Sequence, residues 1–341
     1  MSEWFGEIVG HGRITALLER ELDYPANAYL FVGAASVGKA TVARAFAAAL
    51  LCPSGDPGCN VCRRARGGNH ADLVPVLPDG RATLGVDQVR GIVAQAALSP
   101  VEGSRKVFLF EEAGVMTDQA ANALLKTLEE PTQTTVFILV AESEDEFPAT
   151  VASRCRTVHF GRVAEPDMVP ALAAAGVKAG DAEGLARVAG GRPGLALALA
   201  RQPHVADFRQ LWLSIPGRVT PRPGDAQRLA EEVLTALAPM IKEAVGNEED
   251  EDRRKRAERR AELALLMSGL EILASWYTDS ASLQHAGPIR NTDVALADLT
   301  DVTPARAVAN AELVLDAMVD LQLNLRRQLL LADLFATLGA D

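Results

Sequence analysis

The chain has no long apolar run and no excess of positive charge. Its 341 residues include no uninterrupted apolar stretch of about 18 or more residues, the length that a membrane-spanning helix requires. The start, MSEWFGEIVG, lacks the basic flank and apolar core of a signal peptide. The formal net charge is -11, whereas nonspecific binding to nucleic acid needs a net basic surface. We therefore expect a cytoplasmic protein without a membrane partner, in which at most a local basic face contacts nucleic acid.

Cysteine is also rare, with four residues in the chain. Cys52, Cys59 and Cys62 lie close together in the sequence, and Cys155 lies apart. In a cytoplasmic chain such a group favours a metal site or a structural role over disulfides.

A glycine-bounded loop with a lysine follows the apolar run 28–32. In the stretch 33–41, GAASVGKAT, four residues separate Gly33 from Gly38, and Lys39 follows directly. A strand, this loop and then a helix are the context of a phosphate-binding P-loop, in which backbone N–H groups and the lysine surround phosphate oxygens. The motif places a Ser or Thr after the lysine to bind Mg²⁺. Here that residue is Ala40, and Thr41 comes one place late.

The first half of the chain alternates short apolar runs with helical patterns. The runs 28–32, 74–77, 106–110 and 135–141 predict strands, and 86–98 and 118–130 predict helices. Continuous apolar strands that alternate with helices indicate a parallel sheet covered on both faces.

The composition changes after residue 160. Glycine-punctuated short helices are predicted in 166–200, and long amphipathic helices from 225 to the end. The charge run that starts at 248 allows the pairs Asp250 with Arg254 and Glu251 with Lys255, so we interpret it as a solvated helix face rather than a DNA contact. We expect domains at 1–162, with an insert at 52–70, at 163–203 and at 204–341.

A second half of a nucleotide site is expected after the strand 106–110. An apolar strand that ends in acids supplies one carboxylate for the Mg²⁺ shell and one that polarises water. Glu111 and Glu112 stand at these two positions. The metal-side residue is usually Asp, and Glu111 is one methylene longer.

Several motifs in this order resemble those of one family. Together they are similar to the clamp-loader subunits of bacterial DNA polymerase III, over roughly the first half of the chain. Within this family the chain resembles delta prime subunits more than gamma/tau motor subunits, because its length suits a subunit without the long extension of tau. The motifs are IVGH at 8–11, the loop 33–41, the cysteine cluster, GNHADL at 68–73, NALLKTLEEP at 122–131, Ser-Arg-Cys at 153–155 and, more weakly, the leucine-rich C-terminus around 324–335.

The resemblance implies an α/β P-loop AAA+ core with a parallel sheet, a small helical lid and an all-α collar that holds a ring of subunits together. It implies ATP bound with Mg²⁺ at Gly33, Gly38, Lys39, Thr41 and Glu111. Its implied partners are gamma/tau and delta subunits, the sliding clamp and primed DNA.

The resemblance also implies a role for Arg154. In this family the arginine of the Ser-Arg-Cys motif acts as an arginine finger in the ATP site of a neighbouring subunit, where a planar, permanently charged guanidinium engages phosphate oxygens. The alternative is a surface salt bridge.

Four departures from the family pattern weaken the case for hydrolysis in this chain. Ala40 removes the Mg²⁺ ligand, Glu111 replaces Asp, Glu142 follows the strand 135–141 where active subunits carry Thr or Asn, and Gly194 stands where they carry a sensor arginine. We therefore expect a stator with weak or absent ATPase activity of its own. The alternatives are a gamma/tau-type motor that hydrolyses ATP at Lys39 with Glu112 as base, and a P-loop ATPase unrelated to replication.

The cysteine cluster departs from the family as well. The zinc module of the family has four cysteines, and the fourth position here is Ala65. Three thiolates from Cys52, Cys59 and Cys62 can hold Zn²⁺ if His70 or another group completes a tetrahedron, although His70 belongs to the GNHADL motif. The alternative is three reduced cysteines that pack a small loop.

Overall fold

The computed structural model describes residues 3–78, 83–200, 205–246, 251–291, 294–322 and 326–340. It divides the chain into two compact units, which are described separately. The first comprises Met1–Met168 with Gly191–Gly194, and the second comprises Val169–Gly190 with Leu195–Asp341.

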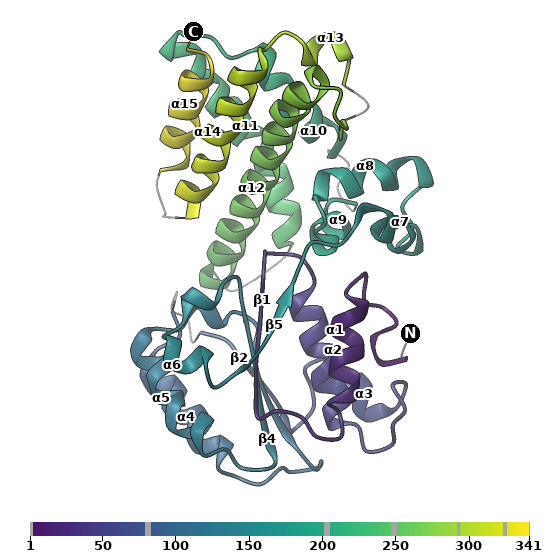
Figure 1. Ribbon diagram of the computed structural model, residues 1–341. Helices are drawn as coiled ribbons and strands as arrows, with labels where there is room; N and C mark the ends of the chain where they lie inside the picture. The colour runs from purple at the N-terminus through teal and green to yellow at the C-terminus, as the bar shows by residue number, and fades with distance from the viewer. Residues whose placement is uncertain are drawn as a thin grey trace. The chain divides into compact units, whose positions relative to one another are not determined.

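The first unit is built on a five-stranded sheet (Figure 1). All strand pairs are parallel, and the strand order is β2-β3-β4-β1-β5. The strands are β1 (Ala28–Gly33), β2 (Leu73–Val76), β3 (Lys106–Phe110), β4 (Thr135–Ala141) and β5 (Arg156–Phe160). In a parallel sheet the carboxyl ends of the strands meet at one edge, so this edge receives the loops that follow β1, β3 and β4.

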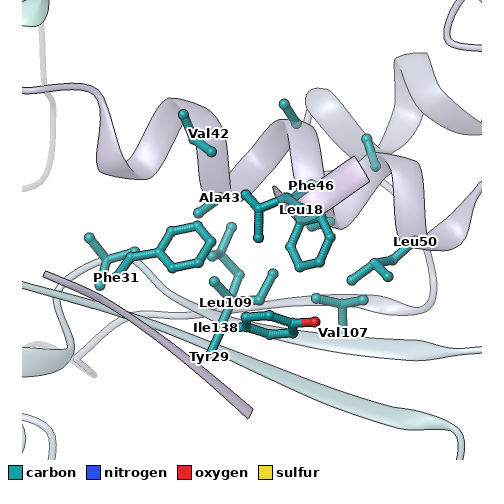
Figure 2. Close-up of a cluster of buried hydrophobic side chains, with 14 of the residues drawn as sticks. Leu18, Tyr29, Phe31, Val42, Ala43, Phe46, Leu50, Val107, Leu109 and Ile138 are labelled. Atoms are coloured by element: carbon teal, nitrogen blue, oxygen red, sulfur yellow. The ribbon is translucent and has the colours of Figure 1, made fainter. Parts of the chain in front are cut away.

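Helices cover both faces of this sheet, as the apolar strands predicted. Successive residues of β1 alternate between the two cores: Tyr29 and Phe31 pack with α2, whereas Leu30 and Val32 pack with α4 and α5. Figure 2 shows the first core, where Phe46 and Leu50 of α2 lie over Val107 and Ile138 of the sheet. The helices of this unit are η1 (Glu3–Phe5), α1 (Gly12–Arg20), α2 (Lys39–Leu51), α3 (Asn60–Arg66), α4 (Val86–Ala96), η2 (Ala113–Val115), α5 (Asp118–Glu129), η3 (Glu144–Glu146) and α6 (Ala149–Ala152).

Four of the five strands were predicted, and β5 was not. Its sequence RTVHF alternates charged or polar residues with apolar ones, and only Val158 and Phe160 are buried. Such a run is too short and too polar to be distinguished from a loop by periodicity. Pairing with β1 along the sheet edge makes it a strand.

The second unit is helical throughout its described residues. The long helix α12 (Glu251–Gln284) packs against α10 (Val205–Ser214), α11 (Pro223–Val245) and α14 (Pro304–Gln322), and α15 (Arg327–Leu338) packs against α11 and α14. The remaining helices are η4 (Ile215–Gly217), α13 (Leu296–Leu299), α7 (Glu165–Ala174), α8 (Ala179–Ala189) and α9 (Pro193–Ala200). The chain passes from one unit to the other within α7, after α8 and within α9.

The predicted fold class, an α/β P-loop core with a parallel sheet followed by helical regions, is confirmed. The boundaries at 162 and 203 stay a prediction. On α12, Lys255 Nζ lies 2.6 Å from Glu251 Oε1, which confirms that pair, while Asp250 lies outside the described residues. None of the helices that the structure describes has the length and apolar character needed to cross a membrane.

Candidate functional site

The loop 33–41 leaves the carboxyl end of β1 and enters α2, as a P-loop requires. Its backbone has positive φ at Gly33 (149°), Ser36 (61°) and Gly38 (110°). A Cβ atom at Gly33 would lie 2.3 Å from the carbonyl oxygen of Phe160, so only glycine fits between β1 and β5 at this point.

Lys39 points back into its own loop. Its ammonium donates hydrogen bonds to the carbonyl oxygens of Gly33 at 2.6 Å and Ala34 at 2.7 Å, and the residue is 7% exposed. Burial lowers the pKa of Lys39, and the charges of Glu142 and Glu146 oppose that shift. The ammonium of Lys39 therefore lies inside the loop 33–41. It has to exchange these carbonyl contacts for phosphate oxygens if a nucleotide binds.

The acid expected on the metal side is already paired. Both carboxylate oxygens of Glu111, at the end of β3, accept hydrogen bonds from the guanidinium of Arg44 on α2, each at 2.5 Å. This pairing raises the pKa of Arg44. Ala40 offers no hydroxyl, and the exposed Thr41 lies one residue further along α2. Glu112 is half-buried at the start of η2.

A second carboxylate that the sequence analysis missed lies near the lysine. Glu146 Oε1 accepts the backbone N–H groups of Glu142 at 2.9 Å and Ser143 at 3.0 Å. Burial raises the pKa of Glu146, and these two hydrogen bonds oppose the shift. The signal in the sequence was the capping box, Ser143 followed three residues later by Glu146. Glu142 and Glu146 together make the edge beside the P-loop acidic, which disfavours a polyphosphate.

Two further residues hold the P-loop from outside. His11, in the IVGH motif, contacts the carbonyl oxygen of Val37 through Nε2 at 2.8 Å. Gly194 donates its backbone N–H to the carbonyl oxygen of Ser36 at 2.9 Å, and a Cβ atom at Gly194 would lie 3.0 Å from that oxygen. The position expected to carry a sensor arginine is therefore packed directly against the loop backbone. Arg192 is buried beside it, at 5% exposure.

Arg154 lies after α6, on the corner that leads into β5. Its guanidinium donates to the carbonyl oxygen of Thr150 at 2.7 Å and forms an ion pair with Glu129 at the end of α5. The Arg154 side chain is 34% exposed. Cys155 beside it is half-buried, and burial raises the pKa of its thiol to about 12.

The three clustered cysteines converge in space. The Sγ atoms of Cys52 and Cys59 lie 3.7 Å apart, those of Cys59 and Cys62 lie 3.4 Å apart, and all three are within 4.8 Å of one another. Cys59 caps α3, where its sulfur accepts the N–H of Cys62 at 3.4 Å. This hydrogen bond is the main cause that lowers the pKa of Cys59 to about 7, whereas burial raises that of Cys62.

His70 is not among the converging groups. Within the described residues, no fourth His, Cys, Asp or Glu joins the three thiols. The buried His70 accepts the N–H of Asp72 through Nδ1 at 3.1 Å, and its Nε2 lies 3.9 Å from a carboxylate oxygen of Glu102. Ala65, at the position of a fourth cysteine, is fully buried. Three thiolates fit three corners of a zinc tetrahedron, and the fourth corner needs a ligand from outside this set.

Asp72, in the GNHADL motif, organises the loop before β3. Its carboxylate accepts three backbone N–H groups, from Val101 at 2.6 Å and from Glu102 and Gly103 at 2.8 Å each. Burial alone would raise the pKa of Asp72, but these hydrogen bonds outweigh it and hold the pKa below its ordinary value. The motif therefore stabilises the loop that leads into β3.

Known proteins are similar to this first half of the chain. The family model described as DNA polymerase III, delta subunit, matches residues 12–164. The delta' subunit of Bacillus subtilis DNA polymerase III is 34% identical over 166 residues, 45% of this chain and 50% of that protein. The delta' subunit from Pseudomonas aeruginosa is 39% identical over 136 residues, 38% and 42% of the two chains. The tau subunit of Bacillus subtilis is 34% identical over 173 residues, 48% and 30%.

The matched region covers half or less of each of these relatives. The two Bacillus subtilis relatives have the same identity to the chain, so identity does not separate the delta' type from the tau type. The P-loop, the cysteine cluster and the Ser-Arg-Cys corner all lie within residues 12–164, the region in which the chain is similar to subunits of DNA polymerase III.

Proposed function

We propose that this chain is a delta prime-like stator of the bacterial replicative clamp loader and works in the cytoplasm. In this role it completes the ATP site of a neighbouring subunit through Arg154 and helps to load the sliding clamp onto primed DNA. Its partners are gamma/tau and delta subunits, and it reaches the clamp and the DNA through the complex. DNA-directed DNA polymerase activity belongs to the holoenzyme rather than to this chain.

The observation that carries the proposal is the engagement of Glu111 by Arg44. Both oxygens that could face Mg²⁺ accept hydrogen bonds from the guanidinium. Ala40 supplies no second ligand, because it has no hydroxyl. A nucleotide would contact Gly33, Gly38 and Lys39, which supports binding. Thr41 stands one position after the place of the usual Mg²⁺ ligand, which argues against efficient hydrolysis.

The position of Arg154 supports action on another chain. Its guanidinium is partly exposed, and Glu129 and the carbonyl of Thr150 hold it on the surface. Such a group is preorganised, carries its charge at every physiological pH and can contact phosphate oxygens in pairs.

The first experiment measures ATP hydrolysis by the purified chain with Mg²⁺. The stator proposal predicts no turnover above background. Turnover that Lys39→Ala abolishes would instead establish the gamma/tau-type motor, with Glu112 as its base. A pull-down that recovers neither gamma/tau nor delta would favour a P-loop ATPase unrelated to replication.

The second experiment tests the finger in a reconstituted complex with gamma/tau and delta subunits. Arg154→Ala should lower the ATPase rate while the complex still assembles, since removing such an arginine costs roughly 10³-fold or more at the affected site. Arg90→Ala is the matched control, because Arg90 is 70% exposed and, among the residues that the structure describes, pairs only with Asp87 one turn away. An unchanged rate in Arg154→Ala would refute the finger.

The cysteine cluster supports a separate proposal, that Cys52, Cys59 and Cys62 hold Zn²⁺ as thiolates. Zinc would tie α3 to the end of α2, and the fourth ligand would come from water or a nearby oxygen. Metal analysis of the purified protein should find one zinc per chain. A metal-free chain with full secondary structure would favour three reduced cysteines that pack the loop.

A further inference from the structure

Glu146 holds a carboxylate beside the P-loop, from the turn that follows β4. Its Oε1 accepts the backbone N–H groups of Glu142 at 2.9 Å and Ser143 at 3.0 Å, so the side chain folds back onto the carboxyl end of β4. That end of β4 lies next to β1, because the N–H of Gly33 donates to the carbonyl oxygen of Glu142 at 3.2 Å. The backbone of Glu142 therefore links this carboxylate to the first residue of the P-loop.

The second oxygen of the same carboxylate lies at the end of β3. A Cβ atom at Gly114 would overlap Oε2 of Glu146, so the carboxylate lies directly against this backbone. Gly114 belongs to η2, which follows β3 after Glu111 and Glu112. The side chain of Glu146 thus fills space between the carboxyl ends of β3 and β4. In a P-loop site the outer phosphates and their metal ion lie between the loop and the acids after this strand.

The charge of Glu146 acts on the lysine of the loop. The ammonium of Lys39 donates hydrogen bonds to two carbonyl oxygens, which are neutral acceptors. Burial lowers the pKa of Lys39, and the charges of Glu142 and Glu146 oppose that shift. Glu146 thus supplies part of the negative charge that a phosphate group would bring to this lysine. A further anion in the same place would be repelled, because like charges at short range repel strongly in a partly buried site.

We propose that Glu146 takes the place of the outermost phosphate of a nucleotide, so that the P-loop binds a nucleoside diphosphate in preference to a triphosphate. This preference rests on the proposed nucleotide contacts of Gly33, Gly38 and Lys39, and it names the nucleotide that they accept. The inner phosphates contact the backbone N–H groups of the loop, whereas a third phosphate would approach a carboxylate fixed by two hydrogen bonds. The alternative is that Glu146 only caps η3, in which case the loop would not distinguish the two nucleotides.

The test measures the dissociation constants of ADP and ATP for the full chain by calorimetry, in EDTA so that no metal ion contributes. The wild type should bind ADP more tightly than ATP by about tenfold or more, because the extra phosphate charge faces Glu146. Glu146→Gln removes the charge and keeps an oxygen for the backbone N–H groups, so it should tighten ATP binding about fivefold or more and change ADP binding by less than about twofold. Equal affinities for the two nucleotides in the wild type, no binding of ADP, or an unchanged ratio in Glu146→Gln would overturn the proposal.

Two control variants separate the charge of Glu146 from its capping role and from the net charge of the chain. Ser143→Ala weakens the same capping box and leaves the carboxylate charged, so the ratio of the two affinities should stay that of the wild type. Asp23→Asn removes an exposed carboxylate from the segment before β1, at the opposite edge of the sheet, and should not change the ratio either. The same change of ratio in either control as in Glu146→Gln would overturn the proposal.

The ratio in the wild type needs no substitution, so it tests the preference even if a variant melts at a lower temperature. Absence of the preference in a chain without ATP turnover would refute the role of Glu146 and leave the stator proposal intact. Turnover that Lys39→Ala abolishes would instead refute the stator proposal.

Discussion

Arg44 and Glu111, 67 positions apart in the sequence, form a bidentate ion pair with both nitrogen–oxygen distances at 2.5 Å. The pair joins the outer face of α2 to the carboxyl end of β3. It is only partly exposed, with the Glu111 side chain at 21%. Because the same two oxygens would have to face a metal ion, the ion pair and a magnesium site compete for one carboxylate.

Removing this competition should improve nucleotide binding only when the missing hydroxyl is restored as well. We expect the double variant Arg44→Gln/Ala40→Thr to bind Mg²⁺-ATP more tightly, by calorimetry, than either single variant. Loss of the ion pair should lower the free energy of unfolding by about 1 kcal/mol or less.

Arg218→Gln is the control for this experiment. It breaks a similar bidentate pair with Glu232 in the helical unit and should change stability by a comparable amount without changing ATP affinity. Equal affinity in the wild type and the double variant would contradict the interpretation that Arg44 withholds Glu111 from a metal.

Removing the charge of Glu129 should not lower the ATPase rate of the complex, whereas removing Arg154 should. Glu129→Gln releases the guanidinium from its ion pair and leaves the hydrogen bond to Thr150 in place. In the reconstituted complex we expect an ATPase rate equal to or above that of the wild type. Arg154→Lys should behave like Arg154→Ala, because an ammonium lacks the planar fork. A rate in Glu129→Gln as low as in Arg154→Ala would show that the ion pair is not a resting contact.

Asp72→Asn should destabilise the first unit by roughly 1–3 kcal/mol, since the amide cannot accept all three backbone hydrogen bonds. The folded pKa of Asp72 lies below its ordinary value of 3.8. Its contribution is therefore complete above that pH and is lost as the pH falls through the folded pKa.

Urea unfolding of the wild type and Asp72→Asn checks this pH dependence. The difference in unfolding free energy should be constant between pH 7 and about pH 5 and should shrink below 3.8. Asp87→Asn, at a 90% exposed position on α4, should change stability by less than about 0.5 kcal/mol. A difference that grows on acidification would contradict the direction of the shift.

Ala65→Cys should restore a fourth zinc ligand. Ala65 lies one helical turn after Cys62 on α3 and is fully buried. We expect zinc affinity, measured by competition with a chelator, to rise at least tenfold, since four thiolates close the tetrahedron. Cys62→Ser should abolish binding, and Cys155→Ser, outside the cluster, should leave it unchanged. Unchanged affinity in Ala65→Cys with an unchanged melting temperature would contradict zinc binding at this corner.

Much of the fold could be predicted from particular residues. The strands 106–110 and 135–141 were predicted at their observed bounds, because a buried parallel strand is apolar at every position. The strand β5 could not be predicted, because its polar residues give no strand pattern. It is a strand because it pairs with β1 at the edge of the sheet. The pair Glu251 with Lys255 was predicted from helical spacing alone.

The candidate site was predicted less completely. Motif spacing identified the P-loop, and the apolar strand before them identified the acids after β3. Neither could reveal that Arg44 pairs with Glu111 or that Glu146 lies near Lys39. These contacts join residues from separate elements, and side-chain direction across a sheet edge depends on how the elements pack. His70 was one candidate for the fourth zinc ligand, and the structure instead turns it toward Asp72 and Glu102.

By itself the sequence determined the parallel sheet, the position of the glycine-bounded loop and the absence of a hydroxyl at Ala40, because these follow from local residue types and spacing. Only the tertiary structure decided the state of the site. It placed Lys39 on the carbonyls of its own loop, Glu111 on Arg44 and Arg154 on Glu129, because each contact depends on where the folded backbone brings a cationic donor within reach of a carbonyl or carboxylate oxygen.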